Sequence, residues 1–110
     1  MKFLVSTFNK ETYTALPIDR YIELSKQSFD FLEQHKRTGE CEQVYFTPDL
    51  HGSIAIWEMS SSDEIVRLMF ENPMRPYSDT TVQPLIESAV VARAQMEWLE
   101  KLGKKQPARV

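Results

Sequence analysis

The chain has 110 residues, of which 42% are hydrophobic and 26% are charged, and its formal net charge at pH 7 is −3. This length predicts one domain with a core of its own, and the composition is typical of a globular protein rather than a disordered or fibrous one. The slightly negative charge gives no electrostatic reason to expect a nucleic acid or an anionic membrane as a partner.

Cysteine and histidine are both scarce. Cys41 is the single cysteine, so we expect neither an intrachain disulfide nor a cysteine-based metal cluster. His35 and His51 are too few for a histidine-rich metal site unless carboxylates or a second subunit complete it. The opening of the chain has only a short apolar run, and no later stretch approaches the roughly 20 residues of a membrane span. We therefore expect a cytoplasmic protein, and the few cysteines and histidines favour no metal site.

The first half of the chain predicts a strand, a helix and two further strands. Residues 3–8 form a β-branched and aromatic run, which favours a strand. Pro17 suits the first turn of a helix, and Thr38-Gly39 offers its end. The apolar residues that recur at helical spacing in between are Ile18, Tyr21, Ile22, Phe29 and Leu32. Residues 43–47 and 53–59 then predict two strands joined by a turn that contains proline and glycine.

The second half predicts a helix, a strand and a long final helix. Residues 60–64 carry hydroxyls and carboxylates that can accept the free N–H groups of a first helical turn. This helix stops before Asn72-Pro73, and residues 80–82 predict a fourth strand, which Pro84 ends or marks as an edge. The final helix, over residues 88–101, is apolar on two sides. One side carries Val91, Ala94, Trp98 and Leu102, and the other carries Ala92, Met96 and Leu99.

The predicted order β-α-β-β-α-β, with an added C-terminal helix, is the ferredoxin-like or split βαβ arrangement of an α+β protein. We expect one domain over residues 1–102 and a polar, frayed tail over residues 103–110. The antiparallel sheet is apolar on both faces, because Phe3 and Val5 point one way while Leu4 and Phe8 point the other. Helices cover one face only, so a second copy of the chain is expected to cover the other, which predicts a homo-oligomer.

Two motifs within residues 53–85 carry a resemblance to a known family. The first is Ile56-Trp57-Glu58-Met59, followed by Ser61, Asp63 and Glu64. The second runs from Pro73 to Leu85 and contains Pro76-Tyr77-Ser78-Asp79-Thr80-Thr81-Val82. They are similar to a strand ending in a carboxylate, and to the Pro-Tyr-x-Asp-x-x-Val core, of muconolactone isomerases in the dimeric α/β-barrel superfamily.

The resemblance implies a sheet-to-sheet dimer with a pocket in or beside each half-barrel. It also implies cofactor-free isomerisation of a small unsaturated lactone acid in bacterial aromatic catabolism. Such a reaction moves a proton along an enolate-like system and needs a base and donors for an oxyanion. The chain differs from the family at two places: Leu4 stands where the family has a histidine, and residues 40–46 hold neither Arg nor His.

Three residues are candidates for the catalytic groups. Glu58 ends a strand among apolar neighbours, and shielding there would raise its pKa into the range of a general acid or base. A strand-end carboxylate can equally face solvent or pair with an arginine. Tyr77 and Asp79 belong to the matched motif, as a donor to an oxyanion and the carboxylate that orients it. The alternative is structural, with Tyr77 as a hydrophobic anchor and Asp79 fixing the turn into the strand.

Four residues are candidates for substrate binding: Tyr45, His51, Trp57 and Arg75. His51 lies beside Asp49 in a turn, as an oriented base at a pocket mouth or as a solvated turn residue. Tyr45 and Trp57, with Phe8 and Phe46, line an apolar pocket or belong to the core or a dimer interface. Arg75 supplies a cation to the substrate, or is a solvated residue of the link before the last strand.

The sequence thus predicts a muconolactone isomerase-like enzyme that shifts a proton in a small unsaturated acid or lactone without a cofactor. One alternative is a non-catalytic protein that binds a small ligand or serves as an accessory oligomer. The other is a cofactor-independent monooxygenase-like member of the same superfamily. The expected partners are a small-molecule substrate and further copies of the chain.

Overall fold

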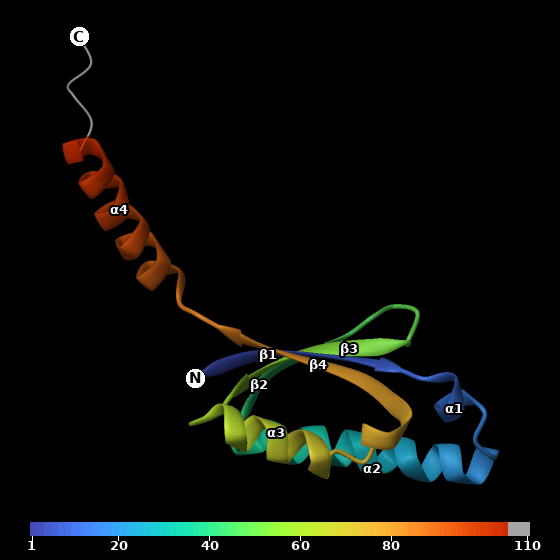
Figure 1. Ribbon diagram of the computed structural model, residues 1–110. Coiled ribbons are helices and arrows are strands. Elements are labelled where there is room, and N and C mark those ends of the chain that lie inside the picture. Colours follow the sequence, from blue (N-terminus) through green and yellow to red (C-terminus); the bar gives the residue numbers. More distant parts are fainter. Residues whose placement is uncertain (106–110) are drawn as a thin grey trace.

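Residues 1–105 are described by a computed structural model, in which two long helices cover one face of an antiparallel sheet and another helix extends away from it (Figure 1). The elements in chain order are β1 (Lys2–Asn9), α1 (Glu11–Thr14), α2 (Ile18–Arg37), β2 (Cys41–Phe46), β3 (Gly52–Glu58), α3 (Ser62–Glu71), the 3-10 turn η1 (Arg75–Tyr77), β4 (Ser78–Leu85) and α4 (Ser88–Lys105). The strands lie in the order β2-β3-β1-β4. The predicted α+β fold with its ferredoxin-like order is confirmed.

The two central strands, β1 and β3, place alternate side chains on opposite faces of the sheet. Phe3 lies opposite Trp57, and Val5 lies opposite Ala55, on the face that the helices cover. These four side chains are buried, and they contact the inward side of α3. The main core cluster consists of Phe3, Val5, Cys41, Ala55, Trp57, Met59, Ile65, Leu68 and Met69. Helix packing on one side of the sheet therefore forms the core.

Helix α3 begins with the capping contacts that its sequence predicts. The Ser61 side chain accepts a hydrogen bond from the Glu64 backbone N–H at 3.3 Å, and the Glu64 carboxylate accepts one from the Ser60 N–H at 3.2 Å. This reciprocal arrangement satisfies two donors that would otherwise be free at a helix start. The same bonds from Ser60 lower the pKa of Glu64. The helix stops at Glu71, one residue before Asn72-Pro73, as predicted.

The buried stripe of α2 differs from the predicted one. Ile18, Ile22 and Phe29 are exposed, so their assignment to the buried stripe is wrong. The inward positions are Tyr21, Leu24, Ser25, Ser28, Phe31, Leu32 and His35. Two of these are serines, so a stripe chosen by hydrophobicity alone misses the side of the helix that faces the sheet. The helical spacing of the inward residues is predicted correctly, but the side of the helix that faces the sheet is not.

The segment between β1 and α2, and the last strand, also differ in detail from the prediction. Residues 11–14 form the short helix α1, which buries Tyr13 in a polar stretch for which no helix is predicted. Strand β4 is longer than predicted and includes Pro84, which pairs opposite Phe3. Pro84 is tolerated because β4 is an edge strand, where a missing N–H leaves no ladder bond unmade.

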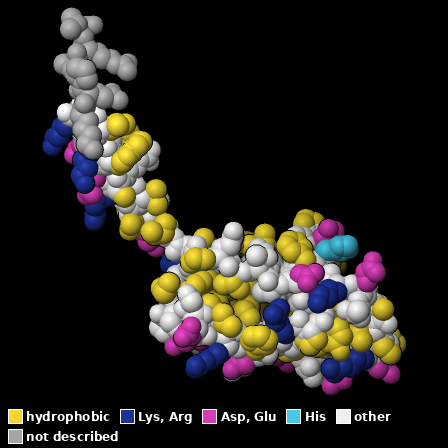
Figure 2. Space-filling model, in the orientation of Figure 1, with side chains coloured by type: hydrophobic (Ala, Val, Ile, Leu, Met, Phe, Trp, Pro, Cys, Tyr) yellow, Lys and Arg dark blue, Asp and Glu magenta, His cyan; other side chains and the backbone are white. Residues whose placement is uncertain are grey.

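Helix α4 leaves the end of β4 and projects from the body of the protein (Figure 1). The radius of gyration is 20.1 Å, against the roughly 13 Å expected for a compact chain of this length. In Figure 2 hydrophobic side chains lie along one side of α4 and charged ones along the other. Its large exposed apolar residues are Val90, Val91, Met96, Trp98, Leu99 and Leu102.

The position at which α4 ends can be compared with the predicted boundary between the domain and its tail. The helix continues to Lys105, beyond the expected domain end at residue 102. From residue 106 on, the predicted frayed tail lies outside the described residues. Within residues 1–105 none of the helices combines the length and apolar composition that crossing a membrane requires.

Candidate functional site

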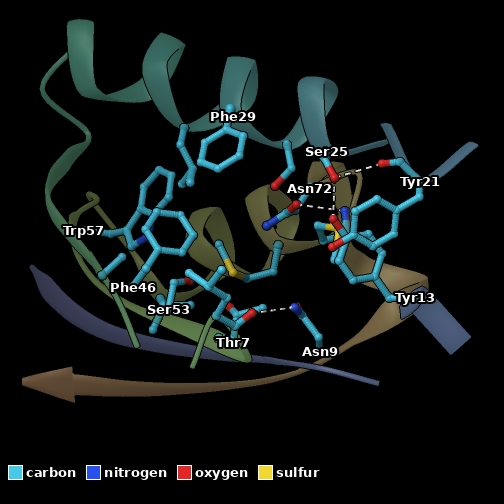
Figure 3. Close-up of a pocket in the computed structure, with 18 residues that line it drawn as sticks. Thr7, Asn9, Tyr13, Tyr21, Ser25, Phe29, Phe46, Ser53, Trp57 and Asn72 are labelled. Atoms are coloured by element: carbon cyan, nitrogen blue, oxygen red, sulfur yellow. Dashed lines mark hydrogen bonds between the residues drawn. The ribbon is translucent and has the colours of Figure 1, made fainter. Parts of the chain in front are cut away.

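A cavity of about 230 Å³ lies between the sheet and the helices α2 and α3 (Figure 3). Its lining comes from β1, α1, α2, β2, the β2–β3 turn, β3, α3 and the link after α3. The residues that line it are Val5, Thr7, Asn9, Tyr13, Tyr21, Ser25, Ser28, Phe29, Leu32, Phe46, Leu50, Gly52, Ser53, Ala55, Trp57, Met69, Asn72 and Met74. A concave space of this kind, largely apolar with a few polar groups, is typical of small-molecule sites.

The polar end of the cavity is a cluster of hydroxyls on α1 and α2. The Tyr13 hydroxyl is hydrogen-bonded to Ser25 Oγ, which lies within 2.8 Å of the Tyr21 carbonyl and donates to it. The rings of Tyr13 and Tyr21 stack at a centroid distance of 4.6 Å. The neighbouring Tyr13 hydroxyl raises the pKa of Tyr21 above the usual tyrosine value. Tyr21, like any tyrosine without a strongly lowered pKa, is protonated near neutral pH and can act as a hydrogen-bond donor.

Two asparagines complete the polar end of the cavity. Asn72 follows the last residue of α3, and its Oδ1 accepts a hydrogen bond from the Met74 N–H at 2.9 Å. This bond fixes the orientation of the amide, and Figure 3 shows the Asn72 side chain reaching toward the cavity. Asn9 ends β1 and donates to the Leu50 carbonyl at 3.4 Å. The two asparagines thus stabilise turns of the chain and place polar atoms at the cavity wall.

The other end of the cavity is aromatic. Trp57 is only 2% exposed and forms the inner wall. Phe29 and Phe46 lie 5.6 Å apart between ring centroids, one from α2 and one from β2, and both are partly open to solvent. Leu50, at the tip of the β2–β3 turn, has a left-handed backbone with φ of 62° and a largely exposed side chain. These last three residues surround the opening of the cavity.

Of the seven predicted site residues, Trp57 is the one that lines this cavity. Glu58 lies at the end of β3, on the alternate face, with its side chain 45% exposed. Its Oε1 is 2.9 Å from the N-terminal amine of Met1, and this hydrogen bond lowers the pKa of Glu58. The expected shielding and raised pKa of Glu58 are therefore wrong, because the strand ends at the protein surface beside a positive charge.

Asp79 and Tyr45 also lie away from the cavity. The Asp79 side chain is 82% exposed and lies 3.7 Å from Lys10 Nζ. Tyr45 is exposed on the open face of β2, where its hydroxyl donates to Gln43 Oε1 at 3.0 Å. Tyr45 lies outside the lining of this cavity, to which the neighbouring residue of the strand, Phe46, contributes, and its position on the open face agrees with the alternative interpretation as an interface residue.

Tyr77, Arg75 and His51 each make local contacts outside the cavity lining. Tyr77 packs against the cluster of Tyr13, Leu24 and Met74, as in its structural interpretation. The Arg75 guanidinium lies 5.0 Å from the centre of the Phe70 ring, beside a separate hollow of about 110 Å³.

His51 takes part in its turn through its backbone. Its N–H donates to Asp49 Oδ1 at 3.1 Å, and its carbonyl accepts from the Asn9 N–H at 2.7 Å. A 2.6 Å bond from the Thr47 hydroxyl, followed by that backbone bond, lowers the pKa of Asp49. The aspartate therefore stabilises the turn through the backbone of His51, as expected for a turn aspartate.

The hydroxyl cluster of Tyr13, Tyr21 and Ser25 is not among the predicted site residues. Tyr21 is predicted only as a member of the buried helical stripe, and Tyr13 lies in the polar stretch before Pro17. A signal was present: Ser25 and Ser28 follow Tyr21 and Leu24 at steps of three and four residues, on the inward side of α2. Serines on the buried stripe of a helix need polar partners or a polar cavity. In residues 1–105 no group of three or more His, Cys, Asp or Glu side chains is placed to hold a metal ion.

The family model described as muconolactone delta-isomerase matches residues 1–89. The chain belongs to this family. The match ends at the start of α4, so most of this helix lies beyond the part that the family shares. No curated protein sequence matches the chain.

Two solved structures are similar in fold to this family member. A muconolactone isomerase is 18% identical, with a TM-score of 0.66 over 79% of this chain and 90% of that one. The 5-chloro-2-hydroxyhydroquinone dehydrochlorinase of Burkholderia phenoliruptrix, in complex with 2,5-dihydroxybenzoquinone, is 21% identical, with a TM-score of 0.62 over 81% of this chain and 97% of that one. At these identities the likeness shows the fold.

Proposed function

We propose that this muconolactone isomerase-like protein shifts a proton within a small unsaturated lactone or a related one-ring carbonyl compound, without a cofactor. The observation that carries the proposal is the cavity, with its aromatic wall at Trp57 and its hydroxyl cluster at Tyr13, Tyr21 and Ser25. Membership of the family supports the reaction type. The volume of about 230 Å³ suits one ring, since a cavity of about 150 Å³ holds benzene.

The proposed chemistry moves a proton from one ring carbon to another. Loss of the first proton leaves an enolate whose oxygen carries negative charge, and donors aimed at that oxygen stabilise the transition state. The Tyr21 hydroxyl, whose pKa lies above the usual tyrosine value, is one such donor near neutral pH, and the hydrogen-bonded hydroxyls of Tyr13 and Ser25 lie beside it. A hydroxide ion from solvent that enters through the cavity opening takes the first proton and becomes water, and this water supplies the proton for the second carbon. The proton returns to the second carbon, so the product is an isomer of the substrate.

A direct test uses α-angelica lactone, a β,γ-unsaturated five-membered lactone, in D₂O with NMR detection. We expect conversion to the α,β-unsaturated isomer with deuterium on the ring. Tyr13→Phe keeps the stacked ring and removes the hydroxyl, so we expect the rate to fall about 100-fold, as for loss of one oxyanion donor. Thr14→Val, which removes an exposed hydroxyl of the same helix outside the cavity lining, is the control. Absence of catalysed exchange would contradict the proposed reaction.

The predicted catalytic roles of Glu58, Tyr77 and Asp79 stay predictions, and so do the binding roles of Tyr45, His51, Trp57 and Arg75. The same assay tests the first of them. Glu58→Gln preserves the side-chain shape and removes the charge, so unchanged turnover would end the proposal that Glu58 transfers the proton. A cytoplasmic location also stays a prediction.

The second candidate function is ligand binding without catalysis. It is favoured by one observation: the residues that line the cavity include no carboxylate and no histidine among those the structure describes, and these are the commonest general bases. A lactone that binds in the cavity but exchanges no deuterium would support this candidate. The two functions thus differ in one measurable outcome on the same probe.

We also propose that a second copy of the chain covers the open face of the sheet. That face carries Leu4, Phe8, Tyr45, Ile54, Ile56 and Leu85, and β1 and β3 place Leu4 directly opposite Ile56. Two apolar surfaces of the same chain, this face and α4, are left uncovered by its other elements. A symmetric dimer would bury the same patch on both copies and let each α4 extend along its partner. A monomer by light scattering at micromolar concentration would contradict this.

A further inference from the structure

The lining of the cavity is electrically neutral. All 18 of its residues carry hydroxyl, amide, thioether, aromatic or aliphatic side chains, or none in the case of Gly52. Tyr21 adds no charge near neutral pH, since its pKa is raised above the ordinary tyrosine value. The groups that could contact a ligand are therefore neutral donors and acceptors.

The C-terminal end of helix α3 lies beside the cavity and slightly disfavours an anionic ligand. Met69, in the last turn of α3, and Asn72, just after it, both line the cavity. The C-terminal carbonyls of a helix carry partial negative charge, about half an elementary charge in total. Helix α2, by contrast, passes the cavity with its side, through Tyr21, Ser25, Ser28 and Leu32. An anionic ligand group would thus face the unfavourable end of α3 without a cation.

We infer that the natural ligand of this cavity is an uncharged one-ring molecule, a lactone, phenol or cyclic ketone without a carboxylate. The inference rests on the proposed function only in using the same cavity as the site. Its aromatic part would pack against Trp57 and Phe46, and its hydroxyl or carbonyl oxygen would meet Tyr13, Tyr21 and Asn72. This uncharged ligand differs from the lactone acid that the family resemblance implies. A lactone acid carries a carboxylate, and an unpaired carboxylate is costly to bury.

The residues of the second strand agree with this specificity. At β2, the Glu42 carboxylate pairs with Lys2 of β1, whose Nζ lies 3.0 Å from Glu42 Oε2, and neither residue is part of the cavity lining. Lys10 and Arg75 are also directed elsewhere, to Asp79 and to the Phe70 ring. Among the described residues, no lysine or arginine lines the cavity.

The experiment compares benzamide with benzoate, which have nearly the same shape and differ in charge, together with phenol. The full chain is labelled with 5-fluorotryptophan, which gives one ¹⁹F signal from Trp57 at the cavity and one from Trp98 on α4. We expect benzamide and phenol to shift the Trp57 signal, with Trp98 as the internal reference. Benzoate should bind at least about tenfold more weakly at pH 7, the equivalent of about 1.4 kcal/mol.

A designed cation supplies the converse test. Ser28→Lys places an ammonium group at the cavity wall, and we expect it to reduce the preference for benzamide over benzoate at least about fivefold. Gln27→Lys adds the same charge at the next, exposed position of α2 and should leave the preference unchanged. Benzoate binding as tightly as benzamide in the unmodified protein would overturn the inference while leaving the site in place. No shift of the Trp57 signal with any of the three probes would overturn both the inference and the cavity as a site.

Discussion

The two faces of the sheet carry similar apolar side chains, but helices cover one face and leave the other open. On the covered face, Phe3, Val5 and Trp57 pack beneath α2 and α3 and are nearly inaccessible to solvent. On the open face, Phe8, Ile54 and Leu85 remain exposed, as do the apolar side chains of α4. The difference teaches that strand alternation alone does not separate a core from an interface. A single chain has enough helix to cover one face, and we propose that another copy covers the other.

The largest expected effect comes from comparing the two tryptophans of the chain. Trp57→Ala removes a side chain that contacts the centre of the core, and we expect the free energy of unfolding to fall by about 3–5 kcal/mol. Trp98→Ala changes a residue that is 60% exposed on α4 and should cost below about 0.5 kcal/mol in the dissociated chain. Denaturant unfolding at low protein concentration measures both. Equal losses would show that α4 packs against its own chain.

The next effect concerns assembly through the open face. Ile54→Glu places a charge at the centre of that face, and we expect the dissociation constant of the oligomer to rise about 100-fold or more, about 2.7 kcal/mol. Val66→Glu adds the same charge at an exposed position of α3 and serves as the control. Light scattering across a dilution series gives the masses. An unchanged mass for Ile54→Glu would place the interface elsewhere.

A smaller effect is expected where β3 passes close to β1. A Cβ on Gly52 would lie 2.3 Å from the Thr7 carbonyl oxygen and 2.7 Å from the Phe8 ring, so backbone and ring must both shift. Gly52→Ala should therefore destabilise the protein by about 1–3 kcal/mol. Gly103→Ala, in α4, meets open space and should increase helicity, with up to about 1 kcal/mol gained. Thermal unfolding and circular dichroism distinguish the two, and a neutral Gly52→Ala would contradict the close approach.

The smallest effect is the pH dependence carried by Glu58. The hydrogen bond from the N-terminal amine lowers the pKa of Glu58 in the folded state. Its contribution to stability is therefore present above the ordinary glutamate pKa of about 4.3, and is lost as the pH falls through the lower folded value. Glu58→Gln should reduce the acid-induced fall in melting temperature slightly. Glu87→Gln, near the same sheet edge, is the control, and an identical change in both variants would contradict the pairing.

Much of the fold could be predicted because local chemistry sets it. The alternation of residues 3–8 and the capping residues 60–64 follow from strand and helix geometry, and both appear as predicted. The motif around Tyr77 identified the family through residues that, in the structure, connect α3 to β4. The residues of the candidate site were predicted less well than the fold. Trp57 lines the cavity, whereas Glu58, next to it on the strand, points to the opposite face and meets the chain terminus.

The sequence by itself determined which residues share a face of each element, because strand and helix periods depend only on backbone geometry. Only the tertiary structure decided which of those faces is covered. It rotated α2 so that Ser25 and Ser28 rather than Ile18 and Ile22 face the sheet, and it brought Tyr13 beside Tyr21. The physical reason is that a cavity between layers forms where several elements pack together. The residue pattern of one element contains no information on how that element packs against the others.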